Sequence, residues 1–573
     1  MEECLLAKES IITEGFGTIK ERLDFIEGEL KERYFNIKWL GIKGEGEEIK
    51  DALEKVISMF GEKGGNIKIP RGNYKLNSTV SIPSNIKIEG DGSETVIDAS
   101  GIDVSTLTDF KFAFNIRGEF GVKGPIESNV SKGDKMVNSS YMSSKLKVGD
   151  LIFIASSQSY MDGGANNLKR GELQEIKNID GKMIYITRGS IFDYDSSEGT
   201  ILTRLIPVEN VCIKNLSIIL GGKGTGHGGI NIAIARNVII EDVHIKGAEN
   251  TGVNFDHSYK CRIEKSNIEE STSPTYLNYN SGYGVVVGKA CAFVDVIENN
   301  FKNCRHAVAG GGTYPPTFTR VFQNNITDNQ LGFALDCHEP CFYWVFQENH
   351  INGCIGGITA RGQFNTIIDN AIMNGGTGIL LESYTVAPFK EGDIVRGNRI
   401  VNCTKEAIYA NGKQGRLETI TIHDNVISDS GDIKVNNAKT VSVCNNTIDS
   451  KGFHSTFRTA ILLEDIEQAV ISQNIIKDFN LYGIRINRCA SYIASSNVFS
   501  NSNQRDIADG IRPSECTHGI ITNNTFYDIA RFAVYANMGD EIVFSNNNAK
   551  NVGNQNRVSF EGLIKVVNVN NII

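Results

Sequence analysis

Residues that could bind anions or transfer protons are concentrated between positions 305 and 382. The set consists of Arg305, His306, Asp336, His338, Arg361 and Glu382. Histidine is the side chain best suited to acid–base work near neutral pH. Arginine binds carboxylates and phosphates through two parallel hydrogen bonds. The set therefore predicts a site that holds an anionic ligand and moves protons.

The two acids are the predicted catalytic pair. Asp336, Arg361 and Glu382 each lie four residues after the small residue of a recurring Gly/Ala–aliphatic motif, which predicts one outward-facing column. Neighbouring strands lie about 4.8 Å apart, so the two carboxylates are expected about 10 Å apart with Arg361 between them. This spacing suits an inverting glycosidase, in which Asp336 is the base and Glu382 the acid. His306 and His338 are expected to orient the pair or shuttle protons. Alternatively, Arg361 only neutralises a surface ladder of acids.

Further polar and aromatic residues near this column are predicted to contact a sugar. The predicted binding residues are Arg305, Arg361, Tyr314, Tyr343, Trp344, Asp256 and His257. The aromatic rings offer flat apolar faces to sugar rings. The sequence contains no compact cluster of aspartates that could hold calcium, so no metal site is predicted. No cofactor is required by the sequence, and a divalent cation is compatible with it.

A repeat provides the framework for these residues. A motif of Asn or Asp followed by an aliphatic or aromatic residue recurs from Asn215 to Asn524 at intervals of 21 to 33 residues. A period of this length indicates stacked units that bury a core only against their neighbours. The β-branched and aromatic residues indicate that the units are strands. The predicted fold is all-β: a right-handed, single-stranded parallel β-helix of about a dozen coils, with asparagines stacked in inward ladders.

The chain is predicted to have four parts. Residues 1–36 carry a heptad pattern (Ile12, Phe16, Ile19, Leu23, Ile26 and Leu30), which favours a trimeric or tetrameric coiled-coil stem. The alternative is one amphipathic helix packed on its own domain. Residues 37–119 are predicted to hold a capping helix over 48–60 and the first coils. Residues 120–206 should form a small β insertion with a hairpin turn at Asp180-Gly181, and residues 207–573 the main β-helix.

Composition excludes several classes of protein. The formal net charge of −9 argues against a nucleic-acid partner. No run of 18 apolar residues occurs, so no membrane insertion is expected. The acidic first residues lack an apolar signal region, which predicts synthesis in the cytoplasm without secretion. The 12 cysteines form no C-x-x-C pair and are read as buried thiols.

Two segments near the N-terminus resemble a known superfamily. Residues 64–74 (GGNIKIPRGNY) and 82–92 (IPSNIKIEGDG) resemble the opening of the pectate-lyase-like β-helix superfamily, found in phage tail spikes and polysaccharide-degrading enzymes. The resemblance extends from about residue 36 to the C-terminus. It implies the β-helix fold and a helix that caps its first coil.

A second resemblance concerns the candidate site. The run Cys304-Arg305-His306-Ala307-Val308, followed by Asp336-x-His338 and Arg361-Gly362, resembles appendage spikes of short-tailed phages that degrade teichoic acid. It implies a homotrimeric depolymerase on a phage or prophage tail, acting at the host surface on teichoic acid or polysaccharide. A polysaccharide lyase of the pectate-lyase type and a non-catalytic glycan-binding adhesin are the alternatives.

Overall fold

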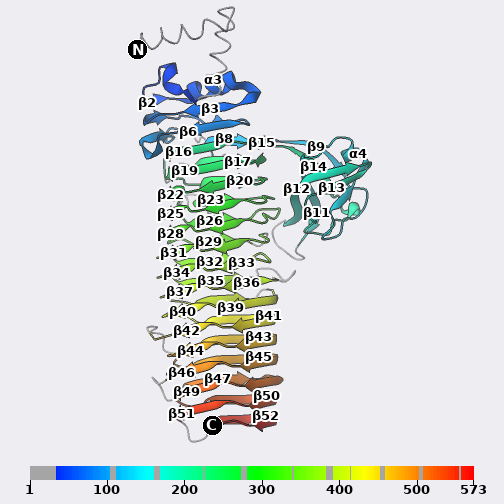
Figure 1. The fold of residues 1–573 in the computed structure, drawn as a ribbon, viewed down its shortest axis with the longest axis vertical. Coiled ribbons are helices and arrows are strands. Elements are labelled where there is room, and N and C mark those ends of the chain that lie inside the picture. The colour runs from blue at the N-terminus through cyan, green and yellow to red at the C-terminus, as the bar shows by residue number, and fades with distance from the viewer. Residues whose placement is uncertain are drawn as a thin grey trace, which may run out of the picture.

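A computed structural model provides the structure of the chain. It describes residues 34–102, 111–160, 168–222, 226–272, 281–338, 341–382, 391–412, 415–451, 459–502, 507–553 and 557–572. The described chain forms a long column of stacked strands with a small β body attached to its side near the N-terminal end (Figure 1). The heptad residues 12–30 lie outside the described residues.

The column is a solenoid in which equivalent strands of successive coils pair in parallel within one 44-stranded sheet. One series of strands carries the candidate site and is called the site row. It comprises β8 (Lys111–Arg117), β17 (His227–Ala233), β20 (Thr251–Asp256), β23 (Tyr283–Val287), β26 (His306–Gly310), β29 (Phe333–Cys337), β32 (Gly356–Ala360), β35 (Thr377–Glu382), β38 (Ile408–Asn411), β41 (Ile433–Cys444), β43 (Thr459–Ser472), β45 (Tyr482–Ser495), β47 (Asp509–Ser514), β50 (Val534–Ser545) and β52 (Val558–Val569).

The remaining strands complete each coil. A second row comprises β21 (Arg262–Glu264), β24 (Asp295–Ile297), β27 (Arg320–Phe322), β30 (Val345–Gln347), β33 (Thr366–Ile368), β36 (Asp393–Arg396) and β39 (Leu417–His423). A third comprises β19 (Ile239–Lys246), β22 (Asn267–Glu269), β25 (Asn300–Lys302), β28 (Asn325–Thr327), β31 (His350–Asn352), β34 (Ala371–Met373), β37 (Arg399–Val401), β40 (Val426–Ser428), β42 (Thr447–Asp449), β44 (Ile475–Lys477), β46 (Val498–Ser500), β49 (Thr525–Ile529) and β51 (Asn548–Val552). The first coils are built from β1 (Tyr34–Asn36), β2 (Glu45–Glu48), β3 (Gly65–Lys68), β4 (Gly72–Lys75), β5 (Val80–Ser81), β6 (Ile86–Glu89), β7 (Thr95–Asp98) and β16 (Cys212–Ile219).

The core lies inside the coils because alternate residues of each strand point inward. In the site row, Val253, Val285, Val308, Leu335, Ile358 and Ile379 stack in register, each with an exposed fraction of 0%. Burying one such side chain stabilises the fold by about 1.5–3 kcal/mol. Helix α3 (Lys50–Phe60) covers the N-terminal end with Leu53, Val56 and Phe60, as predicted.

Buried asparagines bind each coil to the next, as predicted. The ladder comprises Asn299, Asn324, Asn349, Asn370, Asn398, Asn425, Asn446, Asn474, Asn497, Asn524 and Asn547. Each backbone N–H and side-chain amide donates to the Oδ1 of the next asparagine, as in the 3.0 and 2.9 Å bonds from Asn370 to Asn398. The amides thus satisfy buried backbone groups at the corner of each coil.

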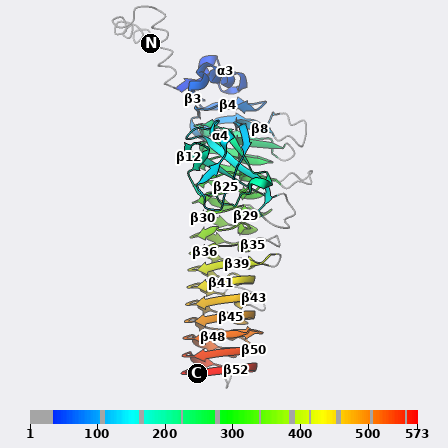
Figure 2. The ribbon, with the colours of Figure 1, turned by 90° about the vertical axis from the view of Figure 1, so that its right-hand side faces the viewer.

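The body beside the solenoid is an insertion between β8 and β15 (Val208–Glu209). Its sheet has the order β10-β13-β12-β11-β14-β9, and its bounds are β9 (Glu119–Pro125), β10 (Met136–Asn138), β11 (Leu151–Ser159), β12 (Lys169–Asp180), β13 (Met183–Ile186), β14 (Ile201–Ile206) and helix α4 (Ser140–Ser143). The predicted hairpin turn at Asp180-Gly181 joins β12 to β13. Figure 2 shows this body in front of the upper coils.

An aromatic stack joins the insertion to the solenoid. Phe293, Phe318, Tyr343 and Phe364 lie one above the other on successive coils, with ring centroids 4.9–5.2 Å apart and nearly parallel planes. Two cations of the insertion cover the stack. Arg188 lies 4.6 Å from the Phe318 ring and Lys132 lies 5.2 Å from the Phe364 ring. Cation–π attraction therefore holds the insertion against several coils at once.

Candidate functional site

The outward column exists, but its residue in the coil of β29 is His338, directly after the strand, and not Asp336. Strand pairing places the column at Asp256, Gly288, Gly311, His338, Arg361, Glu382 and Asn411. The turn before β29 is two residues longer than in the next coil. Eight positions separate Thr327 from Leu335, whereas six separate Asn352 from Ile358. Asp336 consequently lies opposite Thr359, two residues before the column.

Two glycines in the column open a cavity. Gly288 and Gly311 leave room where the other coils carry side chains, and a Cβ on Gly311 would lie 3.3 Å from the Cβ of His338. The cavity has a volume of about 490 Å³, with Asp256 at one end and His338 at the other. Leu168 of the insertion contributes one wall.

A second cavity of about 350 Å³ continues this space toward the N-terminal end. It shares Asn254 and Asp256 with the first cavity and is also lined by Lys111 and Arg117. The two cavities together form a groove along the solenoid axis. Lys289 adds a cation beside Asp256, with its Nζ 4.0 Å from the carboxylate. The groove therefore combines an elongated shape with basic side chains.

Asp336 is the centre of a charged cluster beside this groove. Its side chain is 3% exposed and is paired with Arg361, whose Nη2 lies 2.9 Å from Oδ1 and donates to Oδ2 at 3.0 Å. The Nε2 atoms of His306 and His338 lie 3.5 and 3.4 Å from Oδ2. Asp336 was expected on the surface, and this expectation is wrong because these three side chains cover it.

The same cluster fixes the tautomer of His338. Arg361 Nη1 donates to His338 Nδ1 at 2.8 Å, and a guanidinium group can only donate. Neutral His338 therefore carries its proton on Nε2, which faces Asp336. With a 39% exposed side chain, His338 is the member of the cluster that reaches the cavity.

His306 is buried behind Asp336 and is held by a backbone carbonyl. Its Nδ1 donates to the carbonyl oxygen of Phe333 at 2.6 Å. Burial lowers the pKa of His306 to about 4, and this effect outweighs the attraction of Asp336. His306 is thus neutral at pH 7, and of its two predicted roles, orienting the pair or shuttling protons, this arrangement favours the first.

The lowered pKa of His306 predicts a pH-dependent stability. An unfolded histidine has its ordinary pKa near 6.5, so between pH 6.5 and 4 the unfolded chain binds the additional proton. The free energy of unfolding should fall by about 2 kcal/mol from this residue alone between pH 7 and pH 5. Urea unfolding at both pH values should show a smaller fall for His306→Gln than for the wild type. Equal falls would contradict the assignment.

Glu382 occupies the predicted column position. Its Oε1 accepts a hydrogen bond from Asn411 Nδ2 at 3.1 Å. Its Oε2 is buried and has no hydrogen-bond partner within the described residues. A buried carboxylate oxygen without a donor is unfavourable, so this atom is suited to interact with a ligand.

Asp256 and His257 have different roles. Asp256 is half-buried and lines both cavities, and it contacts His257 Nδ1. His257 is 8% exposed and lies edge-on between Phe120 and Phe153 of the insertion, with centroids 5.2 and 5.0 Å away. His257 therefore positions Asp256 and does not line the groove, in contrast to the prediction.

The predicted aromatic platforms are used for packing. Trp344 is fully buried in the core and donates from Nε1 to Pro316 O at 3.2 Å, so its ring is not available to a sugar. Both faces of Tyr343 are covered in the aromatic stack. Tyr314 packs edge-on against Phe153 of the insertion.

Arg305 contacts Tyr283, a residue that was not among the predicted site residues. Its Nη1 donates to Tyr283 Oη at 3.0 Å, and its guanidinium lies 5.5 Å from the Tyr283 ring. Tyr283 also stacks on His306 and lines the larger cavity. The two column glycines were an available signal for this cavity, since they mark outward positions without side chains.

Comparisons with known proteins agree with this architecture. The family model described as "Right handed beta helix region" matches residues 229–390 and 356–509. The tailspike protein gp49 from Pseudomonas phage LKA1 has a similar structure, with a TM-score of 0.57 and 17% identity, covering 77% of this chain and 76% of that one. The chain is a right-handed parallel β-helix protein.

Two further proteins are similar to parts of this chain. The capsule K1-specific depolymerase of Klebsiella phage K64-1 is 26% identical over 188 residues, which are 32% of this chain. The chain thereby spans 21% of the length of that depolymerase. The Pseudomonas phage phi297 tailspike gp61 has a TM-score of 0.49 and 14% identity, covering 92% of this chain and 80% of that one.

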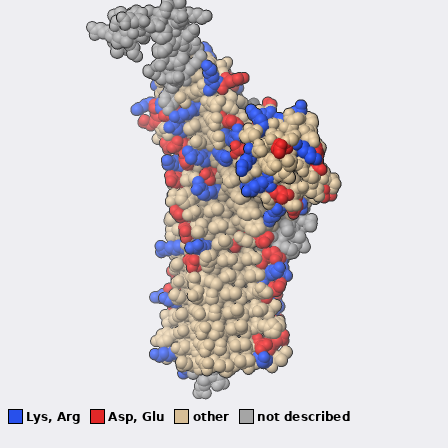
Figure 3. All heavy atoms as spheres, turned by 45° about the vertical axis from the view of Figure 1, so that its right-hand side comes forward, with Lys and Arg blue, Asp and Glu red and all other residues tan. Residues whose placement is uncertain are grey.

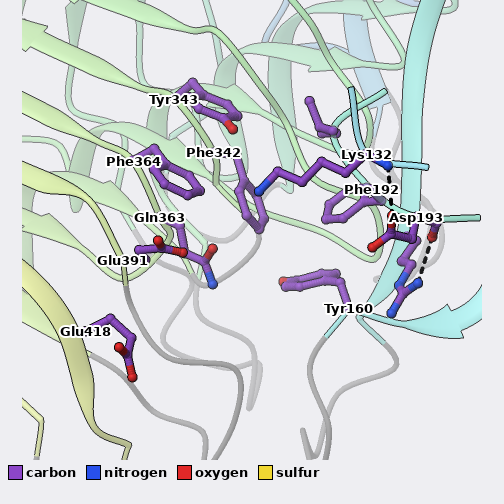
Figure 4. A pocket seen from close by; sticks show the side chains of 12 residues that line it. Lys132, Tyr160, Phe192, Asp193, Phe342, Tyr343, Gln363, Phe364, Glu391 and Glu418 are labelled. Carbon is purple, nitrogen blue, oxygen red and sulfur yellow. Dashed lines mark hydrogen bonds between the residues drawn. The ribbon is translucent and has the colours of Figure 1, made fainter. Parts of the chain in front are cut away.

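A third cavity of about 290 Å³ lies between the β-helix and the insertion. Figure 4 shows Tyr160 and Phe192 of the insertion facing Phe342 of the β-helix, with Lys132 above them and Glu391 on the opposite side. The three rings contact one another at centroid distances of 5.4–5.7 Å. These ring contacts pack the insertion against the β-helix at this cavity.

Charged side chains are unevenly distributed on the face shown in Figure 3. They are numerous over the N-terminal coils and the insertion and sparse toward the C-terminal coils. Among the described residues, no group of three or more His, Cys, Asp or Glu side chains is arranged to hold a metal ion. Nor does the described part of the chain include a helix long and apolar enough to cross a membrane.

Proposed function

We propose that this β-helix is a tailspike-type depolymerase that binds an anionic bacterial surface glycopolymer along the site row and cleaves it by acid–base hydrolysis. The observation that carries the proposal is the outward column. Its two glycines open a groove that ends at His338, and Arg361 and Glu382 follow on the next two coils of the column. An axial groove suits a linear polymer, and its cations suit an acidic one.

Arg361 is proposed to bind the anionic group of the substrate. His338 and Glu382 lie one coil to either side of it, so their backbones are about 10 Å apart. This is the arrangement predicted for two catalytic groups, with His338 in the place of Asp336. Asp336 then positions both His338 and Arg361.

The proposed hydrolysis transfers protons through His338 and Glu382. When Arg361 turns to the substrate anion, His338 Nδ1 is released from its hydrogen bond. It then takes a proton from a water molecule, whose oxygen attacks the anomeric carbon. Asp336 stabilises the resulting imidazolium through Nε2–H. Glu382, in the role of the acid, gives a proton to the leaving oxygen as the glycosidic bond breaks.

The wider setting is part of the same proposal. The named relatives are a phage tailspike and a phage capsule depolymerase. They support a place on a phage or prophage tail, where a homotrimer would act on teichoic acid or capsular polysaccharide at the host surface.

The activity is tested by incubating the protein with purified wall teichoic acids and capsular polysaccharides. New reducing ends are expected if glycosidic bonds are hydrolysed as proposed, and phosphomonoester would instead identify hydrolysis of the phosphodiester bonds of teichoic acid. Ultraviolet absorbance from an unsaturated sugar would instead identify a lyase. Binding without any product would identify an adhesin, and neither binding nor product across the panel would contradict the proposal.

A further inference from the structure

We propose that the C-terminal coils of the site row carry a second anion-binding subsite, formed by Arg485 and Arg512, for a distal acidic unit of the polymer. The proposal rests on the proposed function for the identity of the polymer. Arg485 lies on β45 and Arg512 on β47, and the two residues are directly opposite each other in the parallel ladder. The cleavage proposed near Asp336 does not use this pair of arginines.

Two arginines in this register repel each other. Residues directly opposite on neighbouring strands are about 4.8 Å apart at the backbone, and like charges in such positions are destabilising. An anion that accepts hydrogen bonds from both guanidinium groups removes this repulsion. The pairing is therefore suited to an anionic ligand.

Surrounding residues hold Arg512 in place before any ligand binds. Its guanidinium lies 5.0 Å from the Tyr482 ring and 4.6 Å from the Tyr535 ring. Asp509 is fully buried, and it accepts from Arg512 Nη1 at 3.3 Å and from Arg531 Nε at 2.7 Å. A fixed guanidinium loses little conformational entropy on binding an anion.

Arg485 is held in a similar way. Its guanidinium lies 5.1 Å from the ring of Tyr482, the same ring that Arg512 contacts. Its Nε donates to Asn487 Oδ1 at 3.1 Å. Arg512 and Arg531 share the buried carboxylate of Asp509, and Arg485 lies opposite Arg512 on the neighbouring strand.

The subsite shares one outward line with the proposed catalytic cluster. Strand pairing runs in register through Asp336, Thr359, Leu380, Tyr409, Lys434, Leu462, Arg485 and Arg512. Six coil steps from Asp336 to Arg485 correspond to about 29 Å. A polymer lying along the row would reach both places, and binding at two linked places raises its overall affinity.

The test is calorimetric titration with dextran sulfate oligomers, with uncharged dextran of equal length as the control ligand. The Arg485→Ala/Arg512→Ala variant should bind dextran sulfate at least about tenfold more weakly than the wild type, because two charge-assisted contacts are lost. Arg488→Ala is the matched control protein. It removes a charge from the same strand, but Arg488 is half-exposed and pairs with Asp465. Its affinity should change less than twofold.

Several results would overturn the subsite. One is an equal affinity of the wild type and the double variant for dextran sulfate, and another is an equal loss of affinity in the double variant and Arg488→Ala. A third is binding of uncharged dextran, and the last is a changed assembly mass in the double variant. The last result would make the arginines part of an interface between copies. Titration with dextran sulfate measures binding without any cleavage, so failure of the cleavage proposal is distinguishable from failure of the subsite.

Discussion

Glu382→Gln and His338→Gln should each lower kcat by at least about 100-fold, because general acid and base groups contribute about 10²–10⁴ to a rate. The melting temperature should remain nearly unchanged. Glu382 Oε1 accepts one hydrogen bond that a glutamine oxygen can also accept, and the His338 side chain is 39% exposed. Product release from the cleaved polymer measures the rate, and differential scanning calorimetry measures the stability.

Glu464→Gln is the matched control for Glu382→Gln. Glu464 lies further along the same outward column, opposite Asn436, and its Oε1 accepts from Asn487 Nδ2 at 3.3 Å, just as Glu382 accepts from Asn411. The substitution therefore changes the same chemical group in a similar setting, outside the proposed site. Full activity of Glu382→Gln, or an equal loss in Glu464→Gln, would mean that the cleavage site lies elsewhere.

Asp336→Ala should destabilise the protein by about 3–5 kcal/mol. The side chain is 3% exposed and its removal leaves Arg361 without its carboxylate partner. Breaking one side of a buried ion pair has this magnitude, whereas surface substitutions usually stay within about 0.5 kcal/mol. Urea unfolding of the two proteins at neutral pH measures the difference.

The double variant Asp336→Ala/Arg361→Met distinguishes two causes of the lost stability, an unpaired buried charge and a loss of packing. It removes both charges and should recover much of the lost stability, because replacing a buried pair by apolar groups is often close to neutral. A loss within about 0.5 kcal/mol for Asp336→Ala would contradict the buried cluster. No recovery in the double variant would assign the loss to packing.

The fold was predictable because its signals repeat in most coils. A buried asparagine and a small–aliphatic pair recur along the solenoid, and successive coils repeat the same contacts. The Asp336 error shows the limit of this pattern. Residues 332–335 (GFAL) contain two small–apolar pairs, two positions apart. A shift by two residues keeps every side chain on the same face of a strand, so hydrophobic alternation cannot detect it.

The aromatic platforms were mispredicted for a different reason. Tyr343 has a left-handed backbone with φ of 59°, as do Phe293, Phe318 and Phe364 at equivalent corners. Such a corner breaks the alternation of inward and outward side chains between Tyr343 and buried Trp344. Left-handed aromatic residues are uncommon, and local sequence preference gave no indication of them. Which ring is buried was settled by packing between coils and insertion.

The insertion is topologically separable from the coils that carry the column. Strand β8 pairs directly with β17, so the chain leaves the solenoid and returns to it without a break in the ladder. Leu168 nevertheless forms a wall of the larger cavity, opposite groups supplied by the coils. Evolution can therefore lengthen, shorten or exchange the insertion without changing the register of His338, Arg361 and Glu382. The selectivity of the groove can diverge between related chains while its chemical groups keep their spacing.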